Sequence, residues 1–527
     1  MKRLALSMVV VLAAMGALVF ERRASAEEGE GSPSPDAAAM TRRVDALLAE
    51  RSDAEGIESA PIAGDAEFLR RAYLDLTGRI PRVNEARDFL QDTRPDRRRL
   101  LIDSLLERPD HATHLAVTWR QFLLPDSANV QIFGGAGGFE VWLRDNFADN
   151  KPYDQIVREL LLAQGNLNGG QSGPLLFYTA VQGKPEELAA NTSRAFLGVQ
   201  IQCAQCHDHP FDHWSQRDFW GYAAFFARLS RPPAQQQFLT VVADAEDGEV
   251  SLPDTEEVVP PQFLGGEVVF DEAGMTRRQR LADWFTAPDN PFFAKAAVNR
   301  VWAHLFGRGL VDPVDDMGNH NPVSHPDLMD ELADYFVRSG YDLRGLVRVL
   351  ANTEAYQRTS ASPDGTEVPA DLFVRMAIKS LTAEQLYDCL EVATCRRESA
   401  VTQQYSGQRF DVSRQAFLTK FSDPAAGPTD YHAGIPQALT LMNGSVMRDA
   451  VDLEKSDVLV ALRAPFFTDE NRVETLFLAT LTRLPTDAER EKFLGYVEMR
   501  STREEKNQAL ADILWALLNS AEFTLNH

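Results

Sequence analysis

Residues 202–226 read QCAQCHDHPFDHWSQRDFWGYAAFF and hold a helix signal next to a cysteine motif. Ser215, followed three residues later by Asp218, has the pattern of a capping box, so a helix is predicted to begin there. Four apolar residues then follow at the i, i+3, i+4, i+7 spacing of one helix face: Phe219, Tyr222, Ala223 and Phe226. We expect this face to lie in a hydrophobic core.

Helical patterns of the same kind cover most of the chain on both sides of this stretch. Gly78 and Pro81 are expected to end one of these helices, because glycine and proline terminate helices. Helices are predicted near residues 68–77, 84–91, 95–107, 111–124, 138–148, 152–164 and 185–197, and again near 276–286, 291–306, 326–339, 342–353, 368–379, 382–394 and 510–518. The predicted fold class is therefore mainly α.

A segment of different character separates the two groups of helices. Residues 231–275 contain proline pairs and the β-type segments Phe238–Val242 and Val268–Phe270. We therefore predict two helical domains, residues 37–230 and 276–527, joined by a short β-containing connector with a small hairpin.

The chain is acidic, with a formal net charge of -24 over 527 residues. Nucleic-acid binding requires a surplus of Lys and Arg, so this charge argues against a nucleic-acid partner. The same charge repels the chain from anionic lipid surfaces. Its simplest consequence is solubility.

The N-terminus has the pattern of a secretory signal peptide. Lys2 and Arg3 are positively charged, Leu4–Phe20 is apolar, and Ala24–Ala26 is a small-residue cleavage site. The alternative is an uncleaved anchor helix, although this apolar run is at the short limit for crossing a bilayer. We expect residues 1–26 to be removed and the mature chain to be periplasmic or otherwise exported, without stable membrane insertion.

Cys203, Cys206 and His207 match the C-x-x-C-H pattern of c-type haem attachment. Two thiols must reach the two vinyl groups on one edge of a porphyrin, and two intervening residues on a helical turn give that spacing. His207 is then carried under the iron as an axial ligand. Haem c is therefore the predicted cofactor, and the predicted export supplies the oxidising compartment that its attachment needs.

Two other uses of the motif are open at this point. Thiolates and imidazoles also bind zinc or copper, and His209 and His213 would join Cys203, Cys206 and His207 in such a site. Alternatively, the two cysteines form a redox disulfide, although no βαβ pattern surrounds them.

The other two cysteines, Cys389 and Cys395, lie on or just past a predicted helix. Six helical residues place them roughly 9 Å apart along the axis, beyond the reach of a disulfide. A bond becomes possible if the helix ends between them. We favour two half-buried thiols.

A second polar cluster, GRGLVDPVDDMGNHNPVSHPDL, spans residues 307–328 and contains Asp312, Asp315 and Asp316. A haem iron takes a sixth ligand or keeps an open position, and His and Met are the usual sixth ligands. The sequence offers five candidates for this role: His209, His213, Met317, His320 and His325. The structural alternative for the cluster is a polar loop between two helices, the second capped by Ser324 or Asp327.

Familiar catalytic motifs are absent from the sequence, which has no G-x-S-x-G, Walker loop, G-x-G-x-x-G or H-E-x-x-H. Gly134–Gly138 precedes a predicted helix, and a flexible helix start explains it more simply than an anion cradle. A polysaccharide hydrolase would use a pair of carboxylates, and no pair stands out among the many Asp and Glu residues.

Several long strings resemble a planctomycete family of exported two-domain proteins of unknown function. These strings are FLRRAYLDLTGRIP (68–81), NTSRAFLGVQIQCAQCHDHPFDHWSQRDFWGYAAFFAR (191–228), AVNRVWAHLFGRGLVDPVDDMG (297–318), SHPDLMDELADYF (324–336), GIPQALTLMNG (434–444), LFLATLTRLPTDAER (476–490) and DILWALLNSAEF (512–523). The resemblance implies a cytochrome-like C-x-x-C-H domain followed by a helical domain of unknown function. It carries the haem motif over to Cys203, Cys206 and His207. Longer relatives often insert a β-sandwich where this chain has its short connector, so a glycan-binding role tied to that insert does not carry over.

The expected function is that of an exported c-type haem protein with a redox or electron-transfer role. The resemblance further implies that the protein supports the breakdown of complex polysaccharides. Its expected partners are other exported redox or polysaccharide-degrading proteins. The chain is far longer than a simple electron carrier needs, which favours a haem enzyme or a docking scaffold. Two alternatives are a structural or interaction protein with a zinc, copper or disulfide site at the motif, and a polysaccharide-acting hydrolase.

Overall fold

The computed structural model describes residues 36–124, 137–167, 173–230, 241–362, 365, 367–395, 402–405, 408–421, 441–442 and 444–527. The predicted signal peptide lies outside these residues, as does most of the glycine run at 134–138. Among the residues that the structure describes, no helix is long and apolar enough to cross a membrane.

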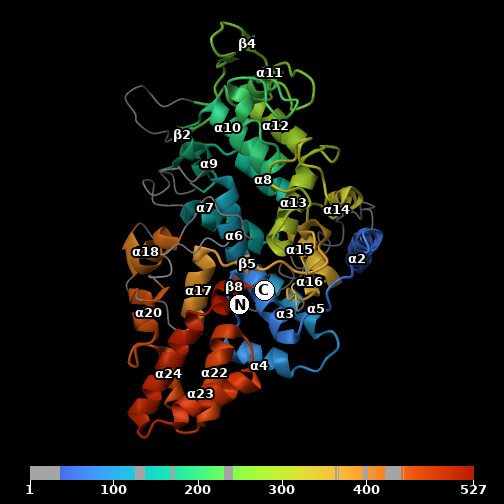
Figure 1. Cartoon of the computed structure of the whole chain (residues 1–527). Coiled ribbons are helices and arrows are strands. Elements are labelled where there is room, and N and C mark those ends of the chain that lie inside the picture. The colour runs from blue at the N-terminus through green and yellow to red at the C-terminus, as the bar shows by residue number, and fades with distance from the viewer. Residues whose placement is uncertain are drawn as a thin grey trace, which may run out of the picture. The chain divides into compact units, whose positions relative to one another are not determined.

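The chain up to residue 230 is built mainly from helices (Figure 1). They are α2 (Ala37–Ala54), α3 (Asp65–Thr77), α4 (Val83–Gln91), α5 (Arg97–Leu106), α6 (Pro109–Leu123), α7 (Gly137–Ala148), α8 (Tyr153–Leu161), α9 (Leu175–Ala180), α10 (Pro185–Thr192) and α11 (Gln216–Ala223). A π-helix, η2 (Ser193–Leu197), continues α10, and two 3-10 turns are η3 (Gln202–Gln205) and η4 (Ala224–Phe226). The helix predicted over 185–197 therefore changes its winding at Ser193.

The second group of helices begins after the predicted connector. It comprises α12 (Arg277–Phe285), α13 (Phe293–Phe306), α14 (Pro326–Arg338), α15 (Leu343–Ala351), α16 (Glu354–Gln357), the 3-10 turn η5 (Ala370–Leu372), α17 (Ala383–Ala393), α18 (Val412–Phe421), α20 (Ser445–Ala450), α21 (Asp457–Leu462), α22 (Asp469–Leu481), α23 (Asp487–Glu498), α24 (Arg503–Leu518) and α25 (Ala521–Thr524). The prediction of a mainly α fold is confirmed.

The strands of the described residues form small antiparallel pairs. They are β1 (Gly165–Asn166) with β2 (Val241–Val242), β3 (Val250–Ser251) with β4 (Val258–Val259), β5 (Lys379–Ser380) with β8 (Leu525–Asn526), and β6 (Thr402–Tyr405) with β7 (Gln408–Asp411). The β3–β4 hairpin lies between the two β-type segments named from the sequence: Val241–Val242 pairs instead with β1, and Val268 forms a single bridge with Gln262.

Local signals in the sequence explain where two of the helices begin and end. Ser215 Oγ accepts the Asp218 N–H, and the Asp218 carboxylate accepts the Ser215 N–H, so the predicted capping box starts α11. Gly78 ends α3 with a φ of 72° and donates its N–H to Leu74 O at 3.1 Å. A Cβ at Gly78 would lie 2.5 Å from His114 Nδ1, so only glycine fits there.

The helix predicted near residues 368–379 is wrong. Only η5 is helical there, and Phe373 has a left-handed φ of 51°, which stops further winding. Leu372, Val374 and Met376 are buried, so the apolar pattern reports burial in the core and not a helix face. The chain then runs into β5, where Lys379 pairs with Asn526.

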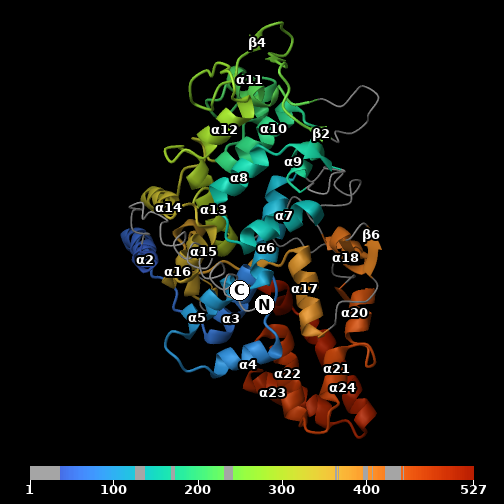
Figure 2. The same cartoon turned by 180° about the vertical axis from the view of Figure 1, so that it is seen from behind.

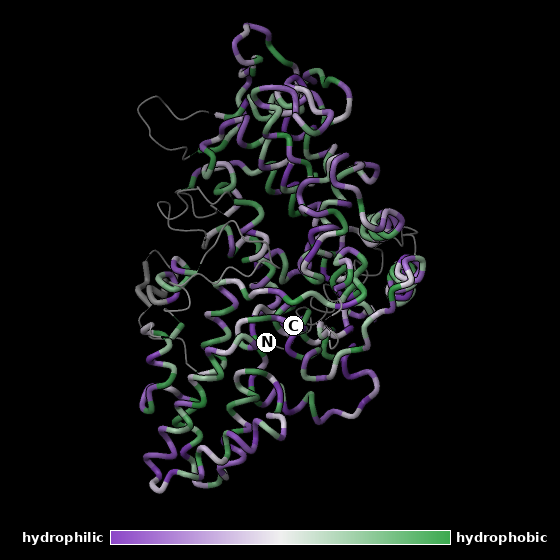
Figure 3. Tube along the Cα trace, in the orientation of Figure 1, coloured by the Kyte–Doolittle hydropathy of each residue, from purple (hydrophilic) through white to green (hydrophobic). Residues whose placement is uncertain are grey.

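Two large hydrophobic clusters organise the described residues from Ala37 onward, and a third, small one joins η4 to the β3–β4 hairpin. The larger one draws on residues from Met40 to Met376 and also includes Leu478, so segments on both sides of the predicted connector share it. The second large cluster is formed mainly by α17 and α20–α25, to which Leu74 and Ile80 also contribute. Helices α22, α23 and α24 contact one another and lie together in both views (Figures 1 and 2). Both hydrophobic and hydrophilic residues occur along these helices (Figure 3), and the buried residues of α22 and α24 are mostly apolar.

A buried polar group, which we name the Asp75 clamp, joins distant parts of the chain. Asp75 Oδ1 accepts hydrogen bonds from Lys379 Nζ at 2.5 Å and Asn526 Nδ2 at 2.7 Å. Asp75 Oδ2 accepts the Tyr356 hydroxyl at 2.9 Å, and His304 Nε2 contacts Asp75 O at 2.9 Å. Burial lowers the pKa of Lys379, while the neighbouring Asp75 carboxylate opposes that shift. The clamp holds the C-terminal strand against α3.

Candidate functional site

The cysteine motif begins on η3, at the surface of the protein. Ala204 is fully buried, which fixes the turn to the core. Cys203 and Cys206 are exposed on either side of it, and both are free thiols. The turn therefore presents two thiols, with two residues between them, at the protein surface.

Helix α11 holds the motif in place from behind. Gln205 O accepts hydrogen bonds from Trp220 Nε1 at 3.0 Å and from Gln216 Nε2 at 3.2 Å. Asp208 Oδ1 accepts the Gln216 N–H at 2.9 Å. Because the Ser215 cap starts this helix, the helix signal and the motif are parts of one unit.

His207 is exposed and has one nitrogen committed. Its Nδ1 lies 2.7 Å from Asp208 O. A carbonyl oxygen can only accept, so Nδ1 carries the hydrogen and Nε2 keeps its lone pair. Metal-ligating histidines commonly have this arrangement, with the second nitrogen bound to a carbonyl or carboxylate.

The second polar cluster lies mainly in the loop between α13 and α14, residues 307–325, which we call the second loop. It packs against the chain that leads into the motif. Asp315 forms an ion pair with Arg194 at 3.1 Å and accepts a hydrogen bond from Gln200 Nε2 at 3.2 Å. The structure thus brings together two segments more than a hundred residues apart in the sequence, which only the candidate ligands Met317, His320 and His325 had linked.

Met317 is fixed in this contact by its backbone and its side chain. Its N–H donates to Gly198 O at 2.7 Å. Gly198 has a φ of +67°, and a Cβ there would lie 3.1 Å from Met317 Sδ and 3.4 Å from the Ala296 Cβ. The thioether therefore packs into the junction between the two segments.

Residues 206–214, between η3 and α11, form what we call the motif loop. Asp212 is a buried carboxylate in this loop. Its side chain is 4% exposed and accepts hydrogen bonds from the His213 N–H at 2.8 Å and from His213 Nδ1 at 2.6 Å. Burial alone would raise the pKa of Asp212, but the hydrogen bonds from His213 and the nearby His320 lower it further than burial raises it. Asp212 is thus an ionised partner that orients His213.

His320 contacts the carboxylate of Asp316 and lies near that of Asp212. Its Nε2 lies 3.0 Å from Asp316 Oδ2. A Cβ at Gly318 would lie 2.7 Å from His320 Nδ1 and 2.6 Å from Asp212 Oδ2, so both atoms crowd that glycine. The His320 ring also stacks on the His209 ring, with centroids 6.4 Å apart.

His209 shapes the turn that follows it. Its ring Nδ1 accepts the backbone N–H groups of Phe211 at 3.3 Å and Asp212 at 3.0 Å. The backbone N–H of His209 donates to Trp214 O at 2.8 Å. Phe211 is 76% exposed at the tip of this turn.

His325 lies apart from the motif. It is 5% exposed at the N-cap of α14, and its ring faces Phe373. Its Nδ1 lies 3.1 Å from Ser324 Oγ, and burial lowers its pKa to about 4. Neither Ser324 nor Asp327, the two capping residues that were predicted, caps this helix by its side chain.

The donor set at the motif fits a covalently attached haem. It supplies two accessible thiols and one imidazole with an open Nε2, and the adjacent Trp214 Nε1 is buried without a hydrogen-bond partner. Within the described ranges, no group of three or more His, Cys, Asp or Glu is arranged to hold a metal ion.

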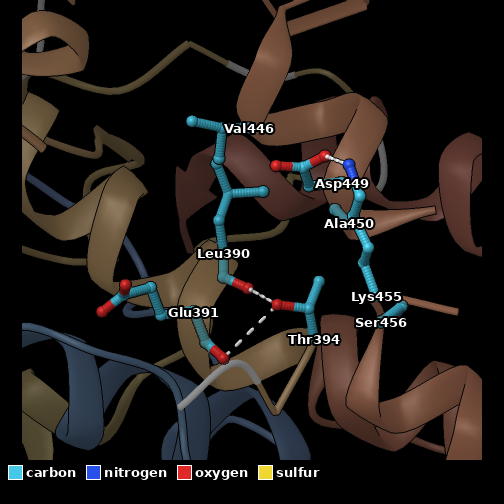
Figure 4. A pocket seen from close by; sticks show the side chains of 8 residues that line it. All are labelled: Leu390, Glu391, Thr394, Val446, Asp449, Ala450, Lys455 and Ser456. Carbon is cyan, nitrogen blue, oxygen red and sulfur yellow. Dashed lines mark hydrogen bonds and ion pairs between the residues drawn. The ribbon is translucent and has the colours of Figure 1, made fainter. Parts of the chain in front are cut away.

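A small hollow of about 110 Å³ lies elsewhere, between α17 and α20 (Figure 4). Lys455 and Asp449 form an ion pair beside it, and Thr394 Oγ1 donates to Leu390 O. None of its lining residues belongs to the motif or to the second loop.

Sequence reasoning missed the supporting residues of this site. Asp208, Asp212, Gln216 and Trp220 carry no motif of their own, and only the contacts show that they hold the imidazoles and the turn. The adjacency of Asp212 and His213 was the one available signal, because a carboxylate next to a histidine can orient it.

The chain is thus a mainly α-helical protein with a surface C-x-x-C-H motif backed by a second polar loop. Two family models match it: a protein of unknown function (DUF1549) over residues 43–231, and a protein of unknown function (DUF1553) over residues 277–415. These matches are consistent with a two-domain family of unknown function. No curated protein and no solved structure matches the chain.

Proposed function

We propose that this chain is an exported c-type haem protein with a redox or electron-transfer role in the periplasm. Cys203 and Cys206 would each add across one vinyl group of the haem, the sulfur bonding to one carbon and the hydrogen to the other. His207 Nε2 would be an axial ligand of the iron. Bound haem would supply one-electron transfer.

The observation that carries this proposal is the state of the five motif residues. Both thiols are free and exposed, and the His207 imidazole has its Nδ1 tied to Asp208 O, which leaves Nε2 outward. A structural disulfide would need neither the histidine nor its fixed tautomer. A structural zinc site would need further ligands close by.

Helix α11 and the buried Ala204 hold this turn in place. Trp220 and Gln216 fasten Gln205, and Ala204 is buried beneath it. A fixed turn keeps the iron ligand in place when the charge of the iron changes, so less of the surroundings must reorganise. Other exported redox or polysaccharide-degrading proteins are the proposed partners.

The test is to export the protein from a host with haem-c maturation and to measure its pyridine haemochrome spectrum and a denaturing-gel haem stain. We expect about one covalent haem per chain. The double variant Cys203→Ala/Cys206→Ala should lose the stain, since no thiol of the motif is left to form a thioether. Cys395→Ala is the matched control, because Cys395 is the other exposed free thiol and should keep the stain.

A folded, colourless wild-type protein would overturn the proposal. Metal analysis and thiol titration of that protein would then separate a zinc or copper site from a plain disulfide.

A further inference from the structure

Among the imidazoles near the motif, His213 stands out by the contacts of its two nitrogens. We propose that His213, oriented by Asp212, is the second axial ligand of the iron at this motif. The inference rests on the proposed function and deepens it, because the sequence left five candidates for this position. Hydrogen-bond partners distinguish His213 from His209 and His320, and packing sets Met317 and His325 apart.

The criterion is the lone pair on the ligating nitrogen. A neutral imidazole has one N–H and one lone pair, so the nitrogen that binds iron is free only when the other one carries the hydrogen. The partner of the second nitrogen therefore decides whether a histidine can ligate.

His213 meets this criterion. Its Nδ1 lies 2.6 Å from Asp212 Oδ1, and a carboxylate can only accept, so Nδ1 carries the hydrogen. The Asp212 side chain is 4% exposed whereas that of His213 is 59% exposed. The ring thus has its Nδ1 toward the interior and its Nε2 toward solvent.

His209 fails the same criterion. Its Nδ1 accepts two backbone N–H groups, from Phe211 and Asp212. A backbone N–H can only donate, so Nδ1 holds the lone pair and the hydrogen is on Nε2. Freeing Nε2 for iron would break both hydrogen bonds and open the turn that His209 closes.

His320 already uses its Nε2, which lies 3.0 Å from Asp316 Oδ2. Its other nitrogen, Nδ1, lies beside the backbone of Gly318, 2.7 Å from the position that an added Cβ would take. Asp316 is also bonded to Asn321 Nδ2 at 2.9 Å, which fixes the carboxylate in that position. The ring serves as a bridge between the motif loop and the second loop.

Met317 and His325 are excluded by packing. Met317 is half-buried beside Gly198 and packs against the larger core cluster, and His325 is 5% exposed against Phe373. Either residue would have to leave its core contacts to reach a surface iron.

His207 and His213 share one pattern. Each is exposed, each donates its Nδ1 hydrogen to an oxygen of the preceding or following aspartate, and each keeps Nε2 open. Both lie on the loop that starts at the second motif cysteine. The structure therefore offers two ligand nitrogens from one short segment.

The experiment compares the absorption and electron paramagnetic resonance spectra of the full-length holoprotein with those of two variants. We expect the oxidised wild type to be low-spin with two nitrogen ligands. His213→Ala should lose the low-spin signal and become high-spin while its gel haem stain is unchanged. Added free imidazole should restore the low-spin spectrum by filling the vacated position. His320→Ala is the matched control and should stay low-spin.

The outcomes separate this inference from the proposed function. A wild type without covalent haem overturns both. A haem-containing wild type that is already high-spin, or a His213→Ala variant that stays low-spin, overturns only the role of His213. Loss of the low-spin signal in His320→Ala with retention in His213→Ala would give the position to His320.

Discussion

The motif loop and the Asp75 clamp both combine imidazoles with carboxylates, and they differ in where the remaining polar atoms point. In the clamp, Lys379 Nζ bonds to Asp75 and to the carbonyls of His304 and Leu305, so all of its hydrogen bonds end inside the protein. In the motif loop, His213 uses one nitrogen inward and leaves the other to solvent. The same residue types are closed inside the protein in one region and leave a nitrogen exposed to solvent in the other.

The comparison shows that the partner of a histidine's second nitrogen distinguishes an imidazole packed in the core from one that is open to a ligand. His111, His114 and His304 gather near the clamp, and their pKa values are lowered by burial. Such groups are expected to stay neutral and to act as packing. Three predictions test the contrast between the two regions, from the largest effect to the smallest.

The largest effect is expected from breaking the clamp with Lys379→Met. The Lys379 and Asp75 side chains are 7% and 3% exposed, so the change leaves a buried carboxylate without its cation. The free energy of unfolding should fall by about 3–5 kcal/mol, measured by urea denaturation.

Lys295→Met is the control for this loss. Lys295 pairs with Asp330 at the surface, with side chains 42% and 63% exposed, and its removal should cost about 0–1 kcal/mol. Equal losses in the two variants would contradict the structural role given to the clamp.

A smaller effect is expected from acid, through His111. Its Nδ1 bonds Leu76 O at 2.7 Å and burial lowers its pKa to about 4, below the unfolded value of about 6.5. The neutral ring therefore contributes stability that is complete above the unfolded pKa and is lost as the pH falls toward the folded one. His111→Asn keeps a donor for Leu76 O. Between about pH 7 and pH 4, the free energy of unfolding of this variant should fall by about 3 kcal/mol less than that of the wild type.

Urea denaturation at several pH values measures this difference. His320→Asn, in the surface loop, provides the comparison for exchanging a polar side chain. A pH dependence identical in His111→Asn and wild type would show that His111 is not a source of acid sensitivity.

The smallest effect is expected from Gly318→Ala, which acts on the motif side of the comparison. The new Cβ would lie 2.5 Å from His320 Cε1 and 2.6 Å from Asp212 Oδ2, so these two side chains must move. We expect a loss of about 1–2 kcal/mol in the free energy of unfolding, with the second loop displaced from the motif.

Gly495→Ala is the matched glycine control, because no atom lies within 4 Å of its added Cβ and the residue is inside α23. It should stabilise the protein by up to about 1 kcal/mol, since alanine favours helix. A Gly318→Ala variant as stable as wild type would mean that the two loops have room to separate.

Much of the fold could be predicted because its signals are local. The Ser215–Asp218 capping box and the Gly78 stop need only neighbouring residues, and both occur as predicted. The segment near 368–379 could not be predicted, because Lys379 is extended to reach Asp75 and Asn526 from other parts of the chain. Its apolar residues satisfy the same burial without a helix.

The site divides in the same way. Spacing alone is enough to name Cys203, Cys206 and His207 as candidates, and all three are exposed in the structure. The choice among the other ligand candidates depends on contacts between the motif and the second loop, such as Asp212 beside Gly318. No local pattern in the sequence encodes that contact.

The contacts of Arg70 have a consequence for the order in which the chain matures. Its guanidinium donates to the carbonyls of Thr480 at 3.0 Å, Phe523 at 2.8 Å and Leu525 at 3.3 Å, the last of which is 455 residues away. Ribosomes add about 5–20 residues per second, so helix α3 waits roughly 20 to 90 s after its own synthesis for these partners. The last hydrogen bonds of α3 therefore form only after the C-terminal residues have been synthesised.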